Sequence, residues 1–247
     1  TSDIAYAAEF VGVELMNTHP ELRIIACTAK SDNIALLIRK DRNITSPQDL
    51  KNASIALCKG TAGEFFLGRY LTLNGMDITE VQPIYLSPDG LISGLFSGKC
   101  DAAIIWEPHV YTIQKQMGSD VLIWPAQGGQ QFYWVAYTLE SLIQNHPDII
   151  QKYLISLSKA EEYMLYHDQE SKKYILSKFN LTEDYYTNLM NKTKYQLNLD
   201  QGLLLALEDE ERWLKQYNPS IMQKNMLMFM NETALRSIRP DAVTIIR

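Results

Sequence analysis

The sequence has few cysteines, no clustered histidines and no long apolar run, and each shortage excludes a class of protein. The three cysteines, Cys27, Cys58 and Cys100, contain no C-x-x-C pair, so neither a disulfide scaffold nor a cysteine-rich metal site is indicated. We expect small buried thiols instead. The four histidines are scattered without ligand spacing, and we expect no metal and no cofactor. No stretch of about 18 apolar residues predicts a transmembrane helix.

Basic clusters are also missing. The chain has 23 Lys and Arg against 29 Asp and Glu, with a net charge of −6, which argues against a nucleic-acid partner. Hydrophobic residues make up 46% and charged residues 21% of the 247 positions, which is ordinary for a globular protein with room for two modest domains. Because the chain starts at Thr1 without a signal peptide, we expect that an export or lipoprotein segment was removed.

The stretch from Ser54 to Val110 predicts a β-α-β-α-β unit with parallel strands and right-handed crossovers. Short apolar runs without polar alternation are typical of strands buried on both faces, and they occur here at 55–58, 82–86 and 102–106. Thr61 and Glu64 have the spacing of a capping box, which predicts a helix start at Thr61. Ser87-Pro88 predicts a second helix start. The helices should end at Asn74-Gly75 and Ser97-Gly98.

In parallel sheets ligands bind outside the carboxyl ends of the strands. Two segments are expected there, Lys59–Gly63 and Trp106-Glu107-Pro108. The first combines free backbone N–H groups with the positive end of a helix dipole, which suits an anion. Two other interpretations stay open: the helix start binds only water, and Trp106 is simply packed in the core.

The remaining chain predicts flanking strands and a helical end. We expect a strand end at 1–5, an amphipathic helix at 6–16, and strands at 22–27, 34–39, 120–124 and 132–138, with a helix at 110–117. From Leu139 onward the pattern is helical. Glu208–Glu211 is expected on a solvated helix face, and the methionine-rich segment 222–230 in the core.

Three segments together resemble a known family. They are D-L-K-N-A-S-I-A-L-C-K-G-T-A-G-E-F-F-L, L-S-P-D-G-L-I-S-G-L-F-S-G-K-C-D-A-A-I-I-W-E-P and the closing A-L-R-S-I-R-P-D-A-V-T-I. They are similar to the nitrate/sulfonate/taurine group of periplasmic substrate-binding proteins of ABC transporters, which includes thiamine-precursor binders. The resemblance implies an α/β, two-lobed type II periplasmic-binding fold. Each lobe would be a mostly parallel sheet flanked by helices, with a helical C-terminal region.

The resemblance also implies domain boundaries and a ligand site. Lobe one would comprise 1–34 and 135–247, and lobe two 35–134, with ligand held between them by hinge closure. Thr61, Ala62 and Gly63 would donate to an anionic group beside Glu64, Trp106 would stack on the ligand and Glu107 could receive an amine. Further ligand residues would be Tyr6, Ala7, Gln130, Gln131 and Tyr133. For the last three, a plain edge strand with exposed amides is an equal alternative.

One departure concerns the start of the chain. The segment Thr1–Ala5 resembles the family's third strand, so the strand–helix–strand that opens lobe one has no counterpart. Either the sequence is trimmed, or something else completes the lobe. The implied role is a non-catalytic, monomeric, extracytoplasmic binder (periplasmic or cell-surface) that delivers a small anionic solute to an ABC permease and ATPase complex. An upstream lipid anchor would attach it peripherally to the membrane.

Two other functions remain open. The same fold resembles enzymes of thiamine-pyrimidine synthesis and of the menaquinone pathway, although the cysteine cluster of the former is missing here. No G-x-S-x-G elbow occurs either. The third possibility is a ligand-sensing module of a membrane signalling protein, which a transmembrane helix in a longer chain would favour.

Overall fold

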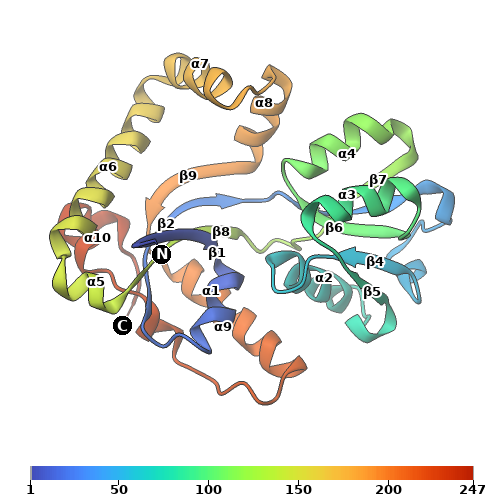
Figure 1. The fold of residues 1–247 in the computed structure, drawn as a ribbon, viewed down its shortest axis with the longest axis horizontal. Coiled ribbons are helices and arrows are strands. Elements are labelled where there is room, and N and C mark those ends of the chain that lie inside the picture. Colours follow the sequence, from blue (N-terminus) through green and yellow to red (C-terminus); the bar gives the residue numbers. More distant parts are fainter. Residues whose placement is uncertain (1, 247) are drawn as a thin grey trace. The chain divides into compact units, whose positions relative to one another are not determined.

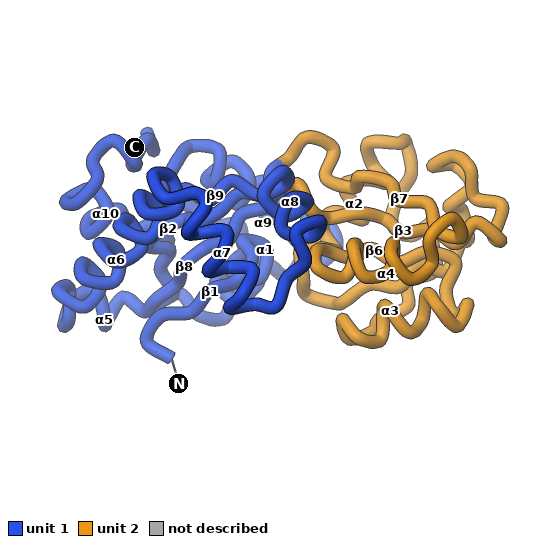
Figure 2. The backbone as a smooth tube through the Cα atoms, turned by 90° about the horizontal axis from the view of Figure 1, so that it is seen from above, with its two compact units in different colours: residues 1–31, 131–247 blue, residues 32–130 orange. Residues whose placement is uncertain are grey.

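Helices and strands divide between two units in a computed structural model that describes residues 2–246. Unit 1 combines residues 1–31 with 131–247, and unit 2 comprises residues 32–130 (Figure 2). These boundaries differ from the expected lobe boundaries at 34/35 and 134/135 by three and four residues. Each unit has its own sheet, its own helices and its own core.

Unit 2 is a mixed sheet flanked by helices. Its elements are, in chain order, β3 (Ile34–Arg39), η1 (Lys40–Arg42), η2 (Pro47–Leu50), β4 (Ser54–Leu57), α2 (Ala62–Leu73), η3 (Ile78–Glu80), β5 (Gln82–Tyr85), α3 (Pro88–Ser97), β6 (Ala102–Trp106), α4 (His109–Met117), η4 (Gly118–Asp120) and β7 (Val121–Pro125), where η marks 3-10 helices.

The sheet of unit 2 has the strand order β5-β4-β6-β3-β7. The strands β4, β5 and β6 are parallel, which confirms the β-α-β-α-β prediction. The helix between β5 and β6 begins as expected, because the Ser87 hydroxyl accepts a hydrogen bond from the Gly90 N–H at 3.2 Å, and it ends at Gly98 with a positive φ of 73°. The strands β3 and β7 run antiparallel to their neighbours.

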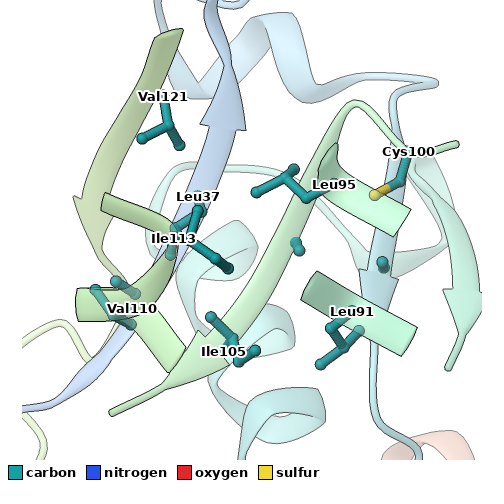
Figure 3. Close-up of a cluster of buried hydrophobic side chains, with 11 residues drawn as sticks. Leu37, Leu91, Leu95, Cys100, Ile105, Val110, Ile113 and Val121 are labelled. Carbon is teal, nitrogen blue, oxygen red and sulfur yellow. The ribbon is translucent and has the colours of Figure 1, made fainter. Parts of the chain in front are cut away.

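The core of unit 2 lies on both faces of this sheet. On one face, α3 and α4 pack their apolar side chains against β3, β4 and β6, as Leu91, Leu95 and Ile113 show in Figure 3. Because side chains alternate between faces along a strand, Ile104 points to the opposite face. There it meets α2, since a Cβ added at Gly63 would lie 3.7 Å from Ile104 Cγ2. Burial on both faces explains why these strands lack polar alternation.

Unit 1 contains a second sheet and a large set of helices (Figure 1). Its elements are β1 (Ile4–Ala8), α1 (Glu9–Met16), β2 (Leu22–Ser31), β8 (Phe132–Leu139), α5 (Glu140–Asn145), α6 (Pro147–Tyr166), α7 (Asp168–Phe179), α8 (Glu183–Lys192), β9 (Thr193–Asn198), α9 (Gln201–Tyr217), η5 (Met226–Phe229), α10 (Thr233–Ile238) and η6 (Pro240–Ala242).

The sheet of unit 1 is antiparallel throughout its described pairs, in the order β1-β8-β2-β9. The α/β class is as expected, but the expectation of a mostly parallel sheet is wrong here. The strands β1 and β2 do run in the same direction, linked by α1. The return strand β8 lies between them and pairs antiparallel with both, so their parallel relation produces no parallel ladder.

Two further expectations for unit 1 are wrong. Tyr6 and Ala7 belong to strand β1 rather than to a helix, which begins only at Glu9; the ladder with β8 outweighs the local helical pattern. The strand β9 interrupts the C-terminal region that was expected to be all helical. Its sequence T-K-Y-Q-L-N does alternate, because Tyr195 and Leu197 are flanked by polar residues, and this period of two was a local signal for the strand that pairs with β2.

The acidic run on α9 is also placed differently from the expectation. Glu210 and Glu211 are 0% and 2% exposed, rather than solvated. The methionine-rich segment divides, because Met226 and Met230 are buried whereas Met222 and Met228 are exposed. None of the helices within residues 2–246 has the length and apolar character needed to cross a bilayer.

Candidate functional site

The first group of expected ligand residues surrounds the N-terminus of α2. The strand β4 ends at Leu57, and its parallel neighbour β6 ends at Trp106, so both carboxyl ends reach the same edge of the unit 2 sheet. Helix α2 starts at Ala62, directly after that edge. Its first turn lies against β6, because a Cβ at Gly63 would lie 3.8 Å from the Ile104 carbonyl oxygen. The fold thus brings Thr61–Gly63 and the end of β6 into one region.

The loop before α2 differs from a capping box. The Thr61 hydroxyl donates to the Cys58 carbonyl oxygen at 2.7 Å instead of accepting from the helix. The Glu64 carboxylate accepts from the Gly60 N–H at 2.8 Å instead of from the N–H of residue 61. Gly60 has a positive φ of 69°, and this turn of the chain directs both polar side chains onto the loop. The capping-box prediction is therefore wrong, although the helix start is right.

Backbone donors remain at this helix start. The first N–H groups of any helix have no acceptor within the helix, and in α2 they belong to Ala62, Gly63 and Glu64. The Glu64 N–H reaches the Thr61 carbonyl oxygen at 2.9 Å. The N–H groups of Ala62 and Gly63 lie at the positive end of the 12-residue α2 dipole, which favours negative charge.

Trp106 and Glu107 follow β6 and have different environments. The Trp106 ring is half-buried, packs against the α3–α4 core cluster and meets the His109 ring edge-on with centroids 6.2 Å apart. The Glu107 side chain is buried, and its Oε2 accepts from the Tyr111 N–H at 3.0 Å. Glu107 therefore stabilises the first turn of α4, a role that its position before a helix could have suggested.

The second group of expected ligand residues lies in unit 1, except for Gln130, which is the last residue of unit 2. Tyr6 and Ala7 are on β1, paired with Ala136 and Val135 of β8. Tyr6 is 45% exposed and Tyr133 only 5%. Burial raises the pKa of the Tyr133 hydroxyl, so this side chain is neutral at ordinary pH. Gln131 precedes β8 and is exposed.

Lys30 and Asp200 join Tyr133 in a polar cluster that the sequence did not reveal. The Lys30 ammonium forms an ion pair with Asp200 and lies 5.3 Å from the centre of the Tyr133 ring. Asp200 also caps α9, because its Oδ1 accepts from the Leu203 N–H at 3.0 Å. The helix start at Asp200 was a possible signal, but nothing in the sequence linked it to Lys30, 170 residues away.

Gln127 is a further residue that the sequence did not single out. Its side chain is 1% exposed, and its Oε1 accepts from the N–H groups of Asn33 at 2.7 Å and Ile34 at 2.9 Å. Its Nε2 donates to the Gln130 carbonyl oxygen at 2.8 Å. One amide thus joins the segment by which the chain enters unit 2 to the segment by which it leaves.

Searches of known proteins find binding proteins. A protein of Brucella abortus described as a binding protein is 25% identical over 129 residues, which cover 51% of this chain and 40% of that relative. An aliphatic sulfonates-binding protein of Escherichia coli is 32% identical over 87 residues, covering 35% of this chain and 27% of the relative. The chain therefore matches less than half the length of these curated relatives.

Solved structures share the fold. A sulfonate-binding SsuA protein of Methylobacillus flagellatus superposes with a TM-score of 0.79 at 16% identity, over 99% of this chain and 78% of that one. The alkanesulfonate-binding SsuA of Xanthomonas axonopodis, bound to MOPS, gives 0.77 at 16% identity, over 93% and 80%. The desulfurization enzyme DSZB gives 0.62 at 14% identity, over 96% and 87%.

The fold is thus that of the periplasmic binding proteins, with two helix-flanked sheets. This agreement confirms the expected fold class. Residues 14–171 match the family model described as "NMT1/THI5 like" and span all of unit 2 together with parts of unit 1. The chain belongs to the NMT1/THI5-like family.

Proposed function

We propose that this chain is the extracytoplasmic solute-binding component of an ABC importer, and that it captures a small anionic solute of the sulfonate or nitrate type. The observation that carries the proposal is the helix start in unit 2, where the N–H groups of Ala62 and Gly63 stand at the positive end of α2 beside the end of β6. Backbone donors at a helix N-terminus form a natural anion site. The sulfonate-binding names of the relatives support this ligand class.

Each expected ligand residue has a proposed part. Trp106 offers a partly exposed ring that can cover an organic group attached to the anion. Thr61 shapes the loop through its hydrogen bond to Cys58. The carboxyl group of Glu64 holds the loop before α2 through the Gly60 N–H, and that of Glu107 stabilises the start of α4. Tyr6, Ala7, Gln130, Gln131 and Tyr133 complete the proposed set of ligand residues.

A binding role is preferred to catalysis, although DSZB shows that an enzyme can have this fold. The thiol beside α2, Cys58, has its pKa raised by burial and by the charge of Glu64. A nucleophilic cysteine needs the opposite, a lowered pKa. The proposed partners are the membrane permease and ATPase of the importer, with the chain acting as a monomer outside the cytoplasm.

Substitution of Ala62 by proline tests the site without removing a hydrogen bond of the helix. Ala62 is the first residue of α2, where proline is tolerated because its missing N–H has no helical acceptor. The preceding Thr61 has φ −120° and ψ 164°, a conformation that suits a residue before proline. The change removes one donor to a bound anion, worth about 1.5–3 kcal/mol, which corresponds to roughly 10- to 150-fold weaker binding.

Binding would be measured by titration calorimetry with ethanesulfonate, MOPS, taurine and nitrate. Glu183→Pro is the matched control, because Glu183 is the exposed first residue of α8 and follows Thr182 in a similar extended conformation. We expect binding of at least one anion by wild type and Glu183→Pro, and its loss or weakening in Ala62→Pro. Equal affinity of all three proteins would refute the site, and no binding of any anion by the wild type would refute the ligand class.

A further inference from the structure

Two carboxyl groups are completely buried in unit 1, whereas the helix start of α2 belongs to unit 2. Glu9 is the first residue of α1 and Glu210 lies in α9, and both side chains are 0% exposed. The two helices pack on each other, and the rings of Phe10 and Trp213 meet edge-on with centroids 5.8 Å apart. The carboxyl groups interact with each other. Within residues 2–246, none of their four oxygens has a hydrogen-bond partner of standard geometry.

Within residues 2–246, no positively charged side chain acts appreciably on this pair. The tyrosines of β8, Tyr133 and Tyr137, face the pair, and Cys27 of β2 lies near Glu9. Asp209 of α9 adds a further negative charge next to Glu210. Lys30 is in the neighbourhood of Cys27, but its ammonium is paired with Asp200. Burial has the largest effect on the pKa of both Glu9 and Glu210. The other influences are the partner carboxyl group, nearby backbone groups and Asp209.

Two carboxylates cannot both stay ionised in such a place. Moving a charge out of water without a partner is very costly, and a second negative charge beside it adds repulsion. Burial accordingly raises the pKa of both groups, that of Glu9 to about 8. A proton held between the two side chains would join one oxygen of each in a hydrogen bond, which accounts for two of the four buried oxygens.

We propose that Glu9 and Glu210 share a proton that holds α1 against α9, and that loss of this proton at alkaline pH destabilises unit 1. The pair is a two-group site with one set of apparent titrations rather than two independent acids. The inference does not depend on the proposed ligand or transport role, because neither Glu9 nor Glu210 belongs to the proposed set of ligand residues.

The sign of the pH effect follows from proton binding. An unfolded glutamate titrates near its ordinary pKa of about 4.3, whereas burial raises the pKa of Glu9 to about 8 and that of Glu210 well above its ordinary value, so the folded pair holds at least one proton over this range. Between these values the folded state holds more protons than the unfolded state, so stability falls as pH rises. For each proton of difference, the unfolding equilibrium constant increases up to tenfold per pH unit.

Urea unfolding at pH 5, 6, 7, 8 and 9 tests this dependence. The variants are Glu9→Gln, Glu210→Gln and the double variant, with Glu208→Gln on the more accessible side of α9 as the control. We expect the wild type and the control to lose stability with rising pH. The double variant lacks the titrating pair, so its unfolding constant should depend less on pH. The difference from wild type should be up to tenfold per pH unit for one proton.

Infrared spectroscopy gives a readout that a merely structural role would not produce. At pH 7 the wild type should show the carbonyl stretch of a protonated carboxylic acid. Each single variant should keep an acid band at a shifted frequency, because its remaining carboxyl group is still buried and protonated but has lost its partner. The double variant should lack the band. If the double variant does not fold, the wild-type band and the single variants decide. The same pH slope in the double variant and the control, or no acid band in the wild type, would overturn the proposal.

Discussion

Replacing Gln127 by leucine should destabilise unit 2 by about 3 kcal/mol. The glutamine oxygen accepts the N–H groups of Asn33 and Ile34, and both residues are buried, at 6% and 2% exposure. Leucine fills much of the same volume but accepts no hydrogen bond. Each buried donor left without an acceptor costs about 1–3 kcal/mol, so two donors at about 1.5 kcal/mol each give the expected value.

Gln127→Glu separates the acceptor role from the donor role. Its carboxylate can still accept both N–H groups, but it cannot donate to the Gln130 carbonyl oxygen as the amide Nε2 does. We expect a loss of more than about 1 kcal/mol at pH 7, because the cost of burying a carboxylate adds to the value of the single lost hydrogen bond. On acidification the carboxyl group regains a donor proton, so this loss should shrink toward pH 4.

The assay is urea unfolding followed by circular dichroism, with Gln116→Leu as the control. Gln116 is an exposed glutamine of α4 in the same unit, and its change should stay within about 0.5 kcal/mol. If Gln127→Leu behaves like Gln116→Leu, the two N–H groups do not depend on this amide. If Gln127→Glu is as unstable as Gln127→Leu at every pH, the separation of roles is wrong.

Three further predictions concern packing, thiol reactivity and acid. Gly12→Ala should cost about 1–3 kcal/mol in thermal or urea unfolding, because the added methyl group would overlap the buried ring of Tyr137; an unchanged stability would show that the ring can move aside. Iodoacetamide at pH 8 should modify Cys58 before Cys27, whose pKa burial raises to about 12, and mass spectrometry of digests would reveal the opposite order. Asp49→Asn should lower stability at pH 6, and its difference from wild type should vanish as pH falls from about 4 toward 2, because hydrogen bonds from Thr45 and Ser46 depress the pKa of Asp49 to about 2. A difference that persists in acid would refute this last reasoning.

The elements of unit 2 were predictable because their signals are local. The strands β4 and β6 lie within a residue of the expected positions, and α3 starts and ends at its predicted caps. These features depend on runs of four to twelve residues, where burial on both faces and cap chemistry act together. Even there the hydrogen-bond partners were not predicted. Helix α2 starts at the expected residue, but the Thr61 hydroxyl donates to the Cys58 carbonyl oxygen and does not cap the helix.

Features formed by residues distant in sequence could not be predicted in this way. The position of β8 between β1 and β2 makes the unit 1 sheet antiparallel, and no local pattern carries that order. The amide of Gln127 serves N–H groups more than 90 positions earlier, and a glutamine in a Gly-Gly loop gives no sign of it. In both cases the structural role depends on a contact with residues far away in the sequence, and only the folded chain brings those residues together.

The acidic run on α9 shows how far such a partner can change an interpretation. Charged residues at consecutive helix positions point in different directions, so Glu208–Glu211 cannot all be solvated if one face of the helix is buried. Leu203, Leu207 and Leu214 mark that buried face, and with 3.6 residues per turn Glu210 lies on it. The helical period alone therefore places a carboxyl group in the core. Only the packing of α1 shows that it meets a second one, Glu9, and that meeting turns an isolated buried acid into a pair able to share a proton.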